Sequence, residues 1–231
     1  MAAPRLARHL SHKSALALLP PSTITPPIEA VRQTHDKQFA RWPPHINLIY
    51  PFLASPSEVA ENEKTAEQQG DGVQASSDPS PPHLKHEIYS RIHKVTKGIQ
   101  PFHISLLADP PGAFSHSKRS KTVWLDPSQQ KSDPPVTPVH NLQAALQAEF
   151  SECGADQRPF TPHLSVGQAK SDVAAQNLSN DIKESISGFL SGSRGSQPVA
   201  LEWYVDKVYV IERKRFYDRF KIVGVVELGK E

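Results

Sequence analysis

The sequence predicts an α+β fold built on antiparallel sheets. Short apolar or β-branched segments typical of strands are mixed with segments of helical spacing, and the two kinds follow one another irregularly. Several neighbouring strand segments are spaced like hairpins, and glycine, proline and serine stand at nearly every junction. A doubly wound parallel sheet would show a more regular alternation, so antiparallel pairing is favoured.

The first elements are framed by prolines. The expected first strand, residues 14–19, is apolar and ends at a pair of prolines. A helix is expected from about residue 26, because proline suits the first helical turn, and Thr25 is its candidate cap. A second strand, 45–50, lies between two further prolines.

Residues 55–82 differ in character from the rest of the chain. They are rich in Glu, Gln, Ser, Gly, Asp and Pro and contain almost no large apolar side chain. Such a segment cannot bury enough surface to offset the entropy lost on ordering. We therefore predict a disordered insertion within a loop and not a domain boundary, since loops tolerate insertions at little cost.

Order is expected to resume with a helix over 86–97, where apolar residues recur at helical spacing. Strands are expected at 102–107 and 121–125, with a basic, serine-rich loop over 110–120 between them. These two strands would form a hairpin with a long connection.

The chain from residue 139 onward is expected to contain two helices and a hairpin, apart from the second motif. An amphipathic helix is expected over 139–150. A longer one over 171–190 begins with Ser171, a residue suited to the cap. The segments 199–211 and 216–228 alternate and are β-branched, which indicates a hairpin. The basic run at its tip, residues 213–215, is expected to face solvent.

The candidate chemistry lies in two matching hexapeptides, PHINLI and PHLSVG. Positions i and i+2 of a strand share a face, so His45 and Asn47 point one way, as do His163 and Ser165. Two such strands across a cleft would present two imidazoles and two hydrogen-bond donors to one ligand. This arrangement suits acid–base chemistry on a phosphate. The structural alternative is that each Pro-His pair simply opens a strand.

Other residues compete for, or add to, this site. His103 and Ser105 form another His-x-Ser pattern, without a preceding proline, which is either a substitute for the first motif or a lining of the cleft. Tyr50 and Trp124 are candidates to line a nucleotide pocket, although core roles are favoured for both.

Composition excludes several classes of protein. The chain has 231 residues, a formal net charge of +2 and a single cysteine, Cys153. An intrachain disulfide and a cysteine-rich zinc site are therefore impossible, and the charge is low for a protein that coats duplex nucleic acid. No apolar run is long enough to span a bilayer, and no metal-binding or glycine-rich phosphate motif is present. We expect no metal, no cofactor and no membrane contact.

The expected compartment is reducing, which a single cysteine favours. The basic N-terminus resembles a weak mitochondrial transit peptide, but a frayed lead-in to the first strand is the favoured interpretation. We therefore expect a cytoplasmic or nuclear protein.

These motifs resemble those of the 2H phosphoesterase superfamily, which includes 2′-5′ RNA ligase-like proteins and cyclic phosphodiesterases. That family is defined by two His-x-Thr/Ser motifs. PHLSV fits the pattern fully and follows Phe160 and Thr161, which is also typical, while PHINL is followed by Tyr50-Pro51-Phe52 as in one subgroup. The resemblance covers nearly the whole chain apart from the insertion. The departure is Asn47, where the family has Thr or Ser.

The resemblance implies one bilobal domain over 1–231, with two pseudo-symmetric lobes around a central cleft. It also implies metal-independent opening of a cyclic phosphate or cleavage of a phosphodiester. His45 and His163 would be catalytic, and Asn47 and Ser165 would bind phosphate. His103 is too near the second motif to place a whole lobe between them, which favours His45. The expected partner is an RNA terminus or a small nucleotide, bound by a monomer.

Two other functions stay open at this point. In one, Asn47 has weakened catalysis, which leaves a module that binds a nucleotide or an RNA end. In the other, the 55–82 insertion binds a partner and the rest of the chain acts as a scaffold.

Overall fold

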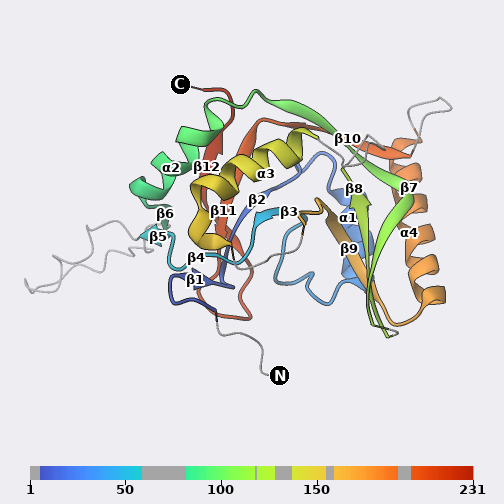
Figure 1. Ribbon diagram of the computed structural model, residues 1–231. Coiled ribbons are helices and arrows are strands. Elements are labelled where there is room, and N and C mark those ends of the chain that lie inside the picture. The colour runs from blue at the N-terminus through green and yellow to red at the C-terminus, as the bar shows by residue number, and fades with distance from the viewer. Residues whose placement is uncertain are drawn as a thin grey trace, which may run out of the picture.

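The structure is a computed structural model that describes residues 6–58, 82–117, 119–127, 137–154, 159–191 and 199–230. In these ranges the chain forms two four-stranded antiparallel sheets, two short ribbons and four α-helices (Figure 1). The predicted α+β class with antiparallel sheets is confirmed. Apart from its ends, the predicted disordered insertion at 55–82 lies outside the described residues.

The first sheet has the strand order β12-β11-β2-β3, and each neighbouring pair is antiparallel. Its strands are β2 (Ser14–Leu18), β3 (Ile46–Ile49), β11 (Lys207–Glu212) and β12 (Lys221–Glu227). Helix α2 (His86–Thr96) contacts β12, and α3 (Pro138–Glu149) contacts β3, so the two helices cover one face of this sheet (Figure 1).

The second sheet repeats this plan with the order β10-β7-β8-β9. Its strands are β7 (Phe102–Ser117), β8 (Ser120–Asp126), β9 (Leu164–Ala169) and β10 (Ala200–Val205). Helices α1 (Pro26–His35) and α4 (Asp172–Leu190) pack against it. Each lobe is thus a four-stranded sheet with two helices, and each motif strand, β3 or β9, is an edge strand of its sheet.

The remaining elements are short. Strand β1 (Leu10–Ser11) pairs with β4 (Phe52–Leu53), β5 (Ser57–Glu58) pairs with β6 (His83–Leu84), and η3 (Ser151–Cys153) is a 3-10 turn. Among the helices that the structure describes, none is long and apolar enough to cross a membrane.

The first sheet buries apolar residues on both faces. Leu16 and Leu18 on β2 are fully buried in the main core beneath the helices. Ala15 and Ala17 alternate with them and point to the opposite face, where they join a smaller buried cluster. That cluster also contains Trp42, Ile211 and Phe220, and through Trp42 it packs against His45 of the first motif.

Helix starts follow the sequence only in part. Pro26 begins α1 as predicted, but Thr25 forms no capping bond, and its hydroxyl donates to the carbonyl of Ser22 at 3.3 Å instead. For α4 the predicted cap is confirmed, since the Ser171 hydroxyl oxygen accepts from the backbone N–H of Ala174 at 3.1 Å.

The prediction of a loop over 110–120 is wrong. Strand β7 continues to Ser117 and forms a long hairpin with β8. The register shifts between Leu107 and Gly112, and this irregularity accommodates Pro110 and Pro111 within a central strand. Prolines usually interrupt a strand, so the sequence pattern gave no sign that this one continues.

The segment 199–211 is also not a single hairpin arm. It divides at Asp206 into β10 of the second sheet and β11 of the first, and only β11 pairs with β12. Before Asp206 the buried side chains include those of Trp203 and Val205, at odd positions, and after it those of Val208 and Val210, at even positions. This switch from odd to even positions marks the point at which the chain passes from one sheet to the other.

Candidate active site

The first motif opens strand β3. His45 and Asn47 are half-buried on one face, whereas Ile46 and Leu48, 0% and 3% exposed, enter the main core. The predicted alternation is therefore confirmed. The Nδ1–H of His45 donates to the carbonyl oxygen of Pro43 at 2.8 Å, because a carbonyl can only accept.

The His45 ring rests on a buried tryptophan. The rings of Trp42 and His45 stack with centroids 4.5 Å apart and an interplanar angle of 16°. Phe220 stacks on Trp42 at 3.8 Å. Trp42 is thus a packing anchor that fixes the plane of the histidine ring.

The second motif has the same local geometry. The Nδ1–H of His163 donates to the carbonyl oxygen of Thr161 at 2.8 Å, two residues upstream as in the first motif. Leu164 and Val166 are fully buried, and Ser165 is half-buried on the face of His163. Both imidazoles therefore have the same tautomer, with Nε2 left for proton transfer.

Two aromatic rings border His163. Phe114 meets it edge-on with centroids 5.0 Å apart, and Trp124 lies at 6.0 Å. Phe114 and Trp124 stack on each other at 4.9 Å. A Cβ at Gly112 would come within 2.3 Å of the Trp124 ring, so glycine is needed for the ring to lie flat across β7.

His163 lies near enough to His45 for its charge to affect the protonation of that ring. The pKa of His45 is lowered to about 4, mainly by burial; the charges of Arg32 and His163 act in the same direction, and the hydrogen bond to Pro43 opposes them. Burial also lowers the pKa of His163, against the effect of its bond to Thr161. Both imidazoles are therefore predominantly neutral at pH 7 in the free protein.

Asn47 is in direct contact with the first histidine. Its amide Nδ2 donates to His45 Nε2 at 3.1 Å, which requires Nε2 to be an unprotonated acceptor. Its Oδ1 is buried and has no hydrogen-bond partner among the described residues. A ligand that displaces the amide from His45 would find both a donor and an acceptor on Asn47.

A sequence model of the 2′-5′ RNA ligase superfamily matches residues 20–215, most of the chain and both motifs. The chain belongs to this superfamily. The 2H phosphoesterase resemblance drawn from the motifs is thereby confirmed, and membership supports an enzyme of the phosphoesterase or ligase-like kind. No functionally curated protein is detectably similar.

Solved structures of similar fold include a protein described as a phosphoesterase, at 16% identity and a TM-score of 0.47, which covers 94% of this chain and 98% of that one. Escherichia coli LigT complexed with 3′-AMP is 14% identical, with a TM-score of 0.45 and the same two coverages. Kluyveromyces marxianus Usb1 is 12% identical, with a TM-score of 0.34, covering 93% of this chain and 96% of its own.

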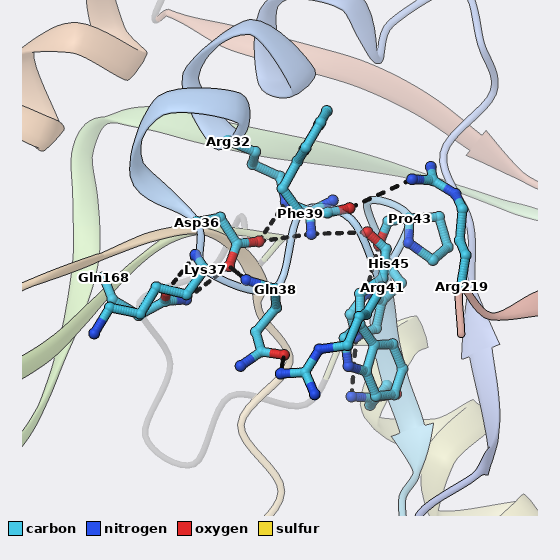
Figure 2. Close-up of polar contacts among 12 residues, drawn as sticks. Arg32, Asp36, Lys37, Gln38, Phe39, Arg41, Pro43, His45, Gln168 and Arg219 are labelled. Carbon is cyan, nitrogen blue, oxygen red and sulfur yellow. Dashed lines mark hydrogen bonds and ion pairs between the residues drawn. The ribbon is translucent and has the colours of Figure 1, made fainter. Parts of the chain in front are cut away.

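In this superfamily member a buried ion pair joins the two motif segments (Figure 2). Arg32 and Asp36 form a salt bridge of 2.7 Å with both side chains 2% exposed, and Arg32 also donates to the carbonyl of Trp42 at 3.0 Å. From β9, Gln168 donates to Asp36 Oδ1 at 2.9 Å and accepts from the backbone N–H of Lys37 at 3.0 Å. The strand of His163 is thus tied to the loop that leads to His45.

The competing motif lies elsewhere on the second sheet. His103 is exposed and packs against Tyr204 with ring centroids 4.7 Å apart, and Ser105 is 5% exposed. Strand register places both on the face of Ser165, but β7 is separated from β9 by β8. No described contact joins either residue to His45 or His163.

Tyr50 lies closer to the first motif. Its ring meets Trp42 edge-on at 5.3 Å, and burial raises the pKa of its hydroxyl. Tyr50 therefore belongs to the surroundings of His45, one ring removed from it.

The Arg32–Asp36 pair was not predicted from the sequence, although charges four residues apart beside the buried Ile28 and Val31 were a usable signal. The prediction for Arg213 is wrong, since this residue was expected to face solvent and is only 4% exposed. Within the described ranges, no three His, Cys, Asp or Glu side chains gather as a metal site would require.

Proposed function

We propose that this chain is a metal-independent phosphodiesterase that acts through His45 and His163. The substrates proposed are RNA ends with a 2′,3′-cyclic phosphate, 2′-5′ linkages, or small cyclic nucleotides. The observation that carries the proposal is the matched pair of imidazoles, each held by an Nδ1–H bond to a backbone carbonyl with Nε2 left for proton transfer. Superfamily membership is in accord with this chemistry.

The proposed reaction needs one proton acceptor and one proton donor. For a cyclic phosphate, Nε2 of one histidine takes a proton from water as its oxygen attacks phosphorus. Nε2–H of the other gives a proton to the ribose oxygen as its bond to phosphorus breaks. The Asn47 amide and the Ser165 hydroxyl would donate hydrogen bonds to the non-bridging oxygens, where negative charge increases.

The test is turnover of a panel of 2′,3′-cyclic nucleotides and 2′-5′ dinucleotides in EDTA. The expected result is hydrolysis that EDTA does not reduce, and the product isomer would identify which ribose oxygen leaves. A wild-type protein that binds these nucleotides with no turnover would contradict the proposal and favour the binding function below.

The second candidate is a nucleotide or RNA-end binding module with weakened catalysis. It is favoured by one contact, the hydrogen bond from Asn47 Nδ2 to His45 Nε2, which occupies the atom that catalysis requires. In this function the two motifs would still hold a phosphate but would transfer protons slowly.

Replacing Asn47 with threonine separates the two functions. If Asn47 is the working phosphate donor, turnover should fall by about tenfold, the order of one hydrogen bond to a charged group. A matched Ser165→Thr variant tests the same position of the second motif. A large gain in rate for Asn47→Thr would instead show that asparagine holds the site back, which supports the binding module.

A further inference from the structure

An open cavity lies beside the first motif. Its volume is about 390 Å³, and it is lined by residues from four separate segments: His12, Gln38, Arg41, Trp42, Tyr50, Arg213 and Phe216. Its volume is within the range of small-ligand sites. Trp42 borders the cavity and also stacks on His45 at 4.5 Å, so the cavity lies one ring away from the proposed catalytic centre.

Arg213 is a buried cation on the wall of this cavity. It is 4% exposed, donates to the carbonyl oxygen of His12 at 3.1 Å and also to that of Phe216. Its guanidinium lies 4.6 Å from the ring centroids of both Phe216 and Phe220. Its Nε is buried with no hydrogen-bond partner in the described part of the chain.

Arg41 adds a second positive charge to the same cavity. Its guanidinium bonds to the Gln38 side chain and lies 5.4 Å from the Phe216 ring centroid. The lining contains no carboxylate, and within the described residues neither arginine forms an ion pair. Two guanidinium groups thus share one partly desolvated space whose lining supplies no counter-charge, and the carboxylate of Asp218, whose charge acts on Arg213, lies outside this lining.

A buried charge without an ion-pair partner is costly, and burial lowers the pKa of Arg213, although the charge of Asp218 opposes this. An anion in the cavity would remove that cost. Guanidinium groups match phosphate geometrically, and the rings of Tyr50 and Phe216, which line the same cavity, offer apolar surface for an attached base or sugar.

We propose that this cavity is a second phosphate subsite, where Arg41 and Arg213 hold a non-reacting phosphate of the substrate. This inference rests on the proposed function, and it narrows the substrate to nucleotides that carry a phosphate beyond the one that reacts. An RNA 3′ end, whose last nucleoside carries a 5′-phosphodiester, has this chemistry, and so does a 5′-phosphorylated mononucleotide. An unphosphorylated cyclic mononucleotide does not.

The test compares three substrates: adenosine 2′,3′-cyclic phosphate, its 5′-phosphorylated form, and the dinucleotide ApA with a terminal 2′,3′-cyclic phosphate. We expect the two phosphorylated substrates to exceed the first in kcat/KM by about tenfold to a hundredfold, the range of one or two charge-assisted hydrogen bonds. A further gain for the dinucleotide over the 5′-phosphate would identify RNA as the better source. Equal values for all three would overturn the subsite.

The Arg41→Gln variant should reduce this preference by about tenfold, because it removes one of the two charged hydrogen-bond donor groups. Arg215→Gln is the matched control, since Arg215 is exposed on the same turn as Arg213 and does not line the cavity. A preference that is undiminished in Arg41→Gln, or that is reduced equally in the control, would contradict the proposal. The Arg213→Lys variant tests the role of the buried arginine, provided that its unfolding transition is the same as that of the wild type.

A binding measurement keeps this inference separate from the proposed function. If none of the three substrates is hydrolysed, titration by calorimetry still compares their Kd values. If the 5′-phosphorylated nucleotide binds more tightly and Arg41→Gln reduces this gain, the subsite is supported although the phosphodiesterase proposal fails. If the substrates are hydrolysed but the 5′-phosphate changes neither KM nor Kd, the phosphodiesterase proposal is supported and the subsite is overturned.

Discussion

Alanine at His45 or at His163 should lower kcat for a 2′,3′-cyclic nucleotide by about 10²–10⁴-fold, the usual contribution of one general acid or base. Each imidazole has its Nδ1–H bonded to a backbone carbonyl, so Nε2 is the ring atom that transfers the proton. Alanine removes that atom. Because the two act on one substrate as a unit, the double variant should be no slower than the slower single variant. Chromatographic separation of cyclic and linear nucleotides measures all three rates.

His86→Ala is the matched control for these variants, since His86 is exposed at the start of α2 and contacts Ser90. Its turnover should equal that of the wild type. His103→Ala decides between the competing first motifs. Activity that persists in His45→Ala and disappears in His103→Ala would show that the assignment of the first motif is wrong.

Replacing Asp36 with alanine should lower the free energy of unfolding by about 3–5 kcal/mol, the cost of leaving a buried charge without its partner. Arg32 would lose the carboxylate that it contacts at 2.7 Å, with both side chains 2% exposed. Gln168 would lose its acceptor on the same carboxylate, so the connection between β9 and the loop before His45 would loosen as well. Urea unfolding followed by circular dichroism measures the change.

Glu227→Gln is the control for this loss, because the ion pair of Glu227 with Lys230 is exposed and is expected to contribute less than about 1 kcal/mol. The double variant Arg32→Met with Asp36→Leu should recover most of the stability, since no unpaired charge then remains. An Asp36→Ala variant no less stable than Glu227→Gln would contradict the structural role given to the pair.

The sequence was sufficient for features set by local pattern. The alternation around His45 and His163 follows from strand geometry alone, so the shared faces of Asn47 and Ser165 with these histidines were predictable from residue spacing. The capping bond of Ser171 depends only on the residue three positions later, and it too was predicted correctly.

Features set by contacts between distant segments could not be predicted in this way. The buried Arg213 donates hydrogen bonds to the carbonyls of His12 and Phe216. The basic triplet at the turn does not by itself predict these contacts. The division at Asp206 depends on which sheet receives each half of the segment. The proximity of His45 and His163 likewise needed the tertiary structure, although the family resemblance implied it.

The pH dependence of kcat/KM for a 2′,3′-cyclic nucleotide in EDTA is the most direct test of acid–base catalysis by this pair. In the productive form one histidine is neutral and the other is protonated at Nε2 as well, and the population of this form is greatest between the two apparent pKa values. Burial lowers the pKa of His45 to about 4 and brings that of His163 below its ordinary value of 6.5. We therefore expect a bell-shaped profile with its maximum on the acid side of pH 6.5, where the rate falls at lower pH as both rings become protonated and at higher pH as both become neutral. One limb should disappear in His45→Ala and the other in His163→Ala. A rate that rises steadily through neutral pH, or a bell that is unchanged in either variant, would contradict the mechanism.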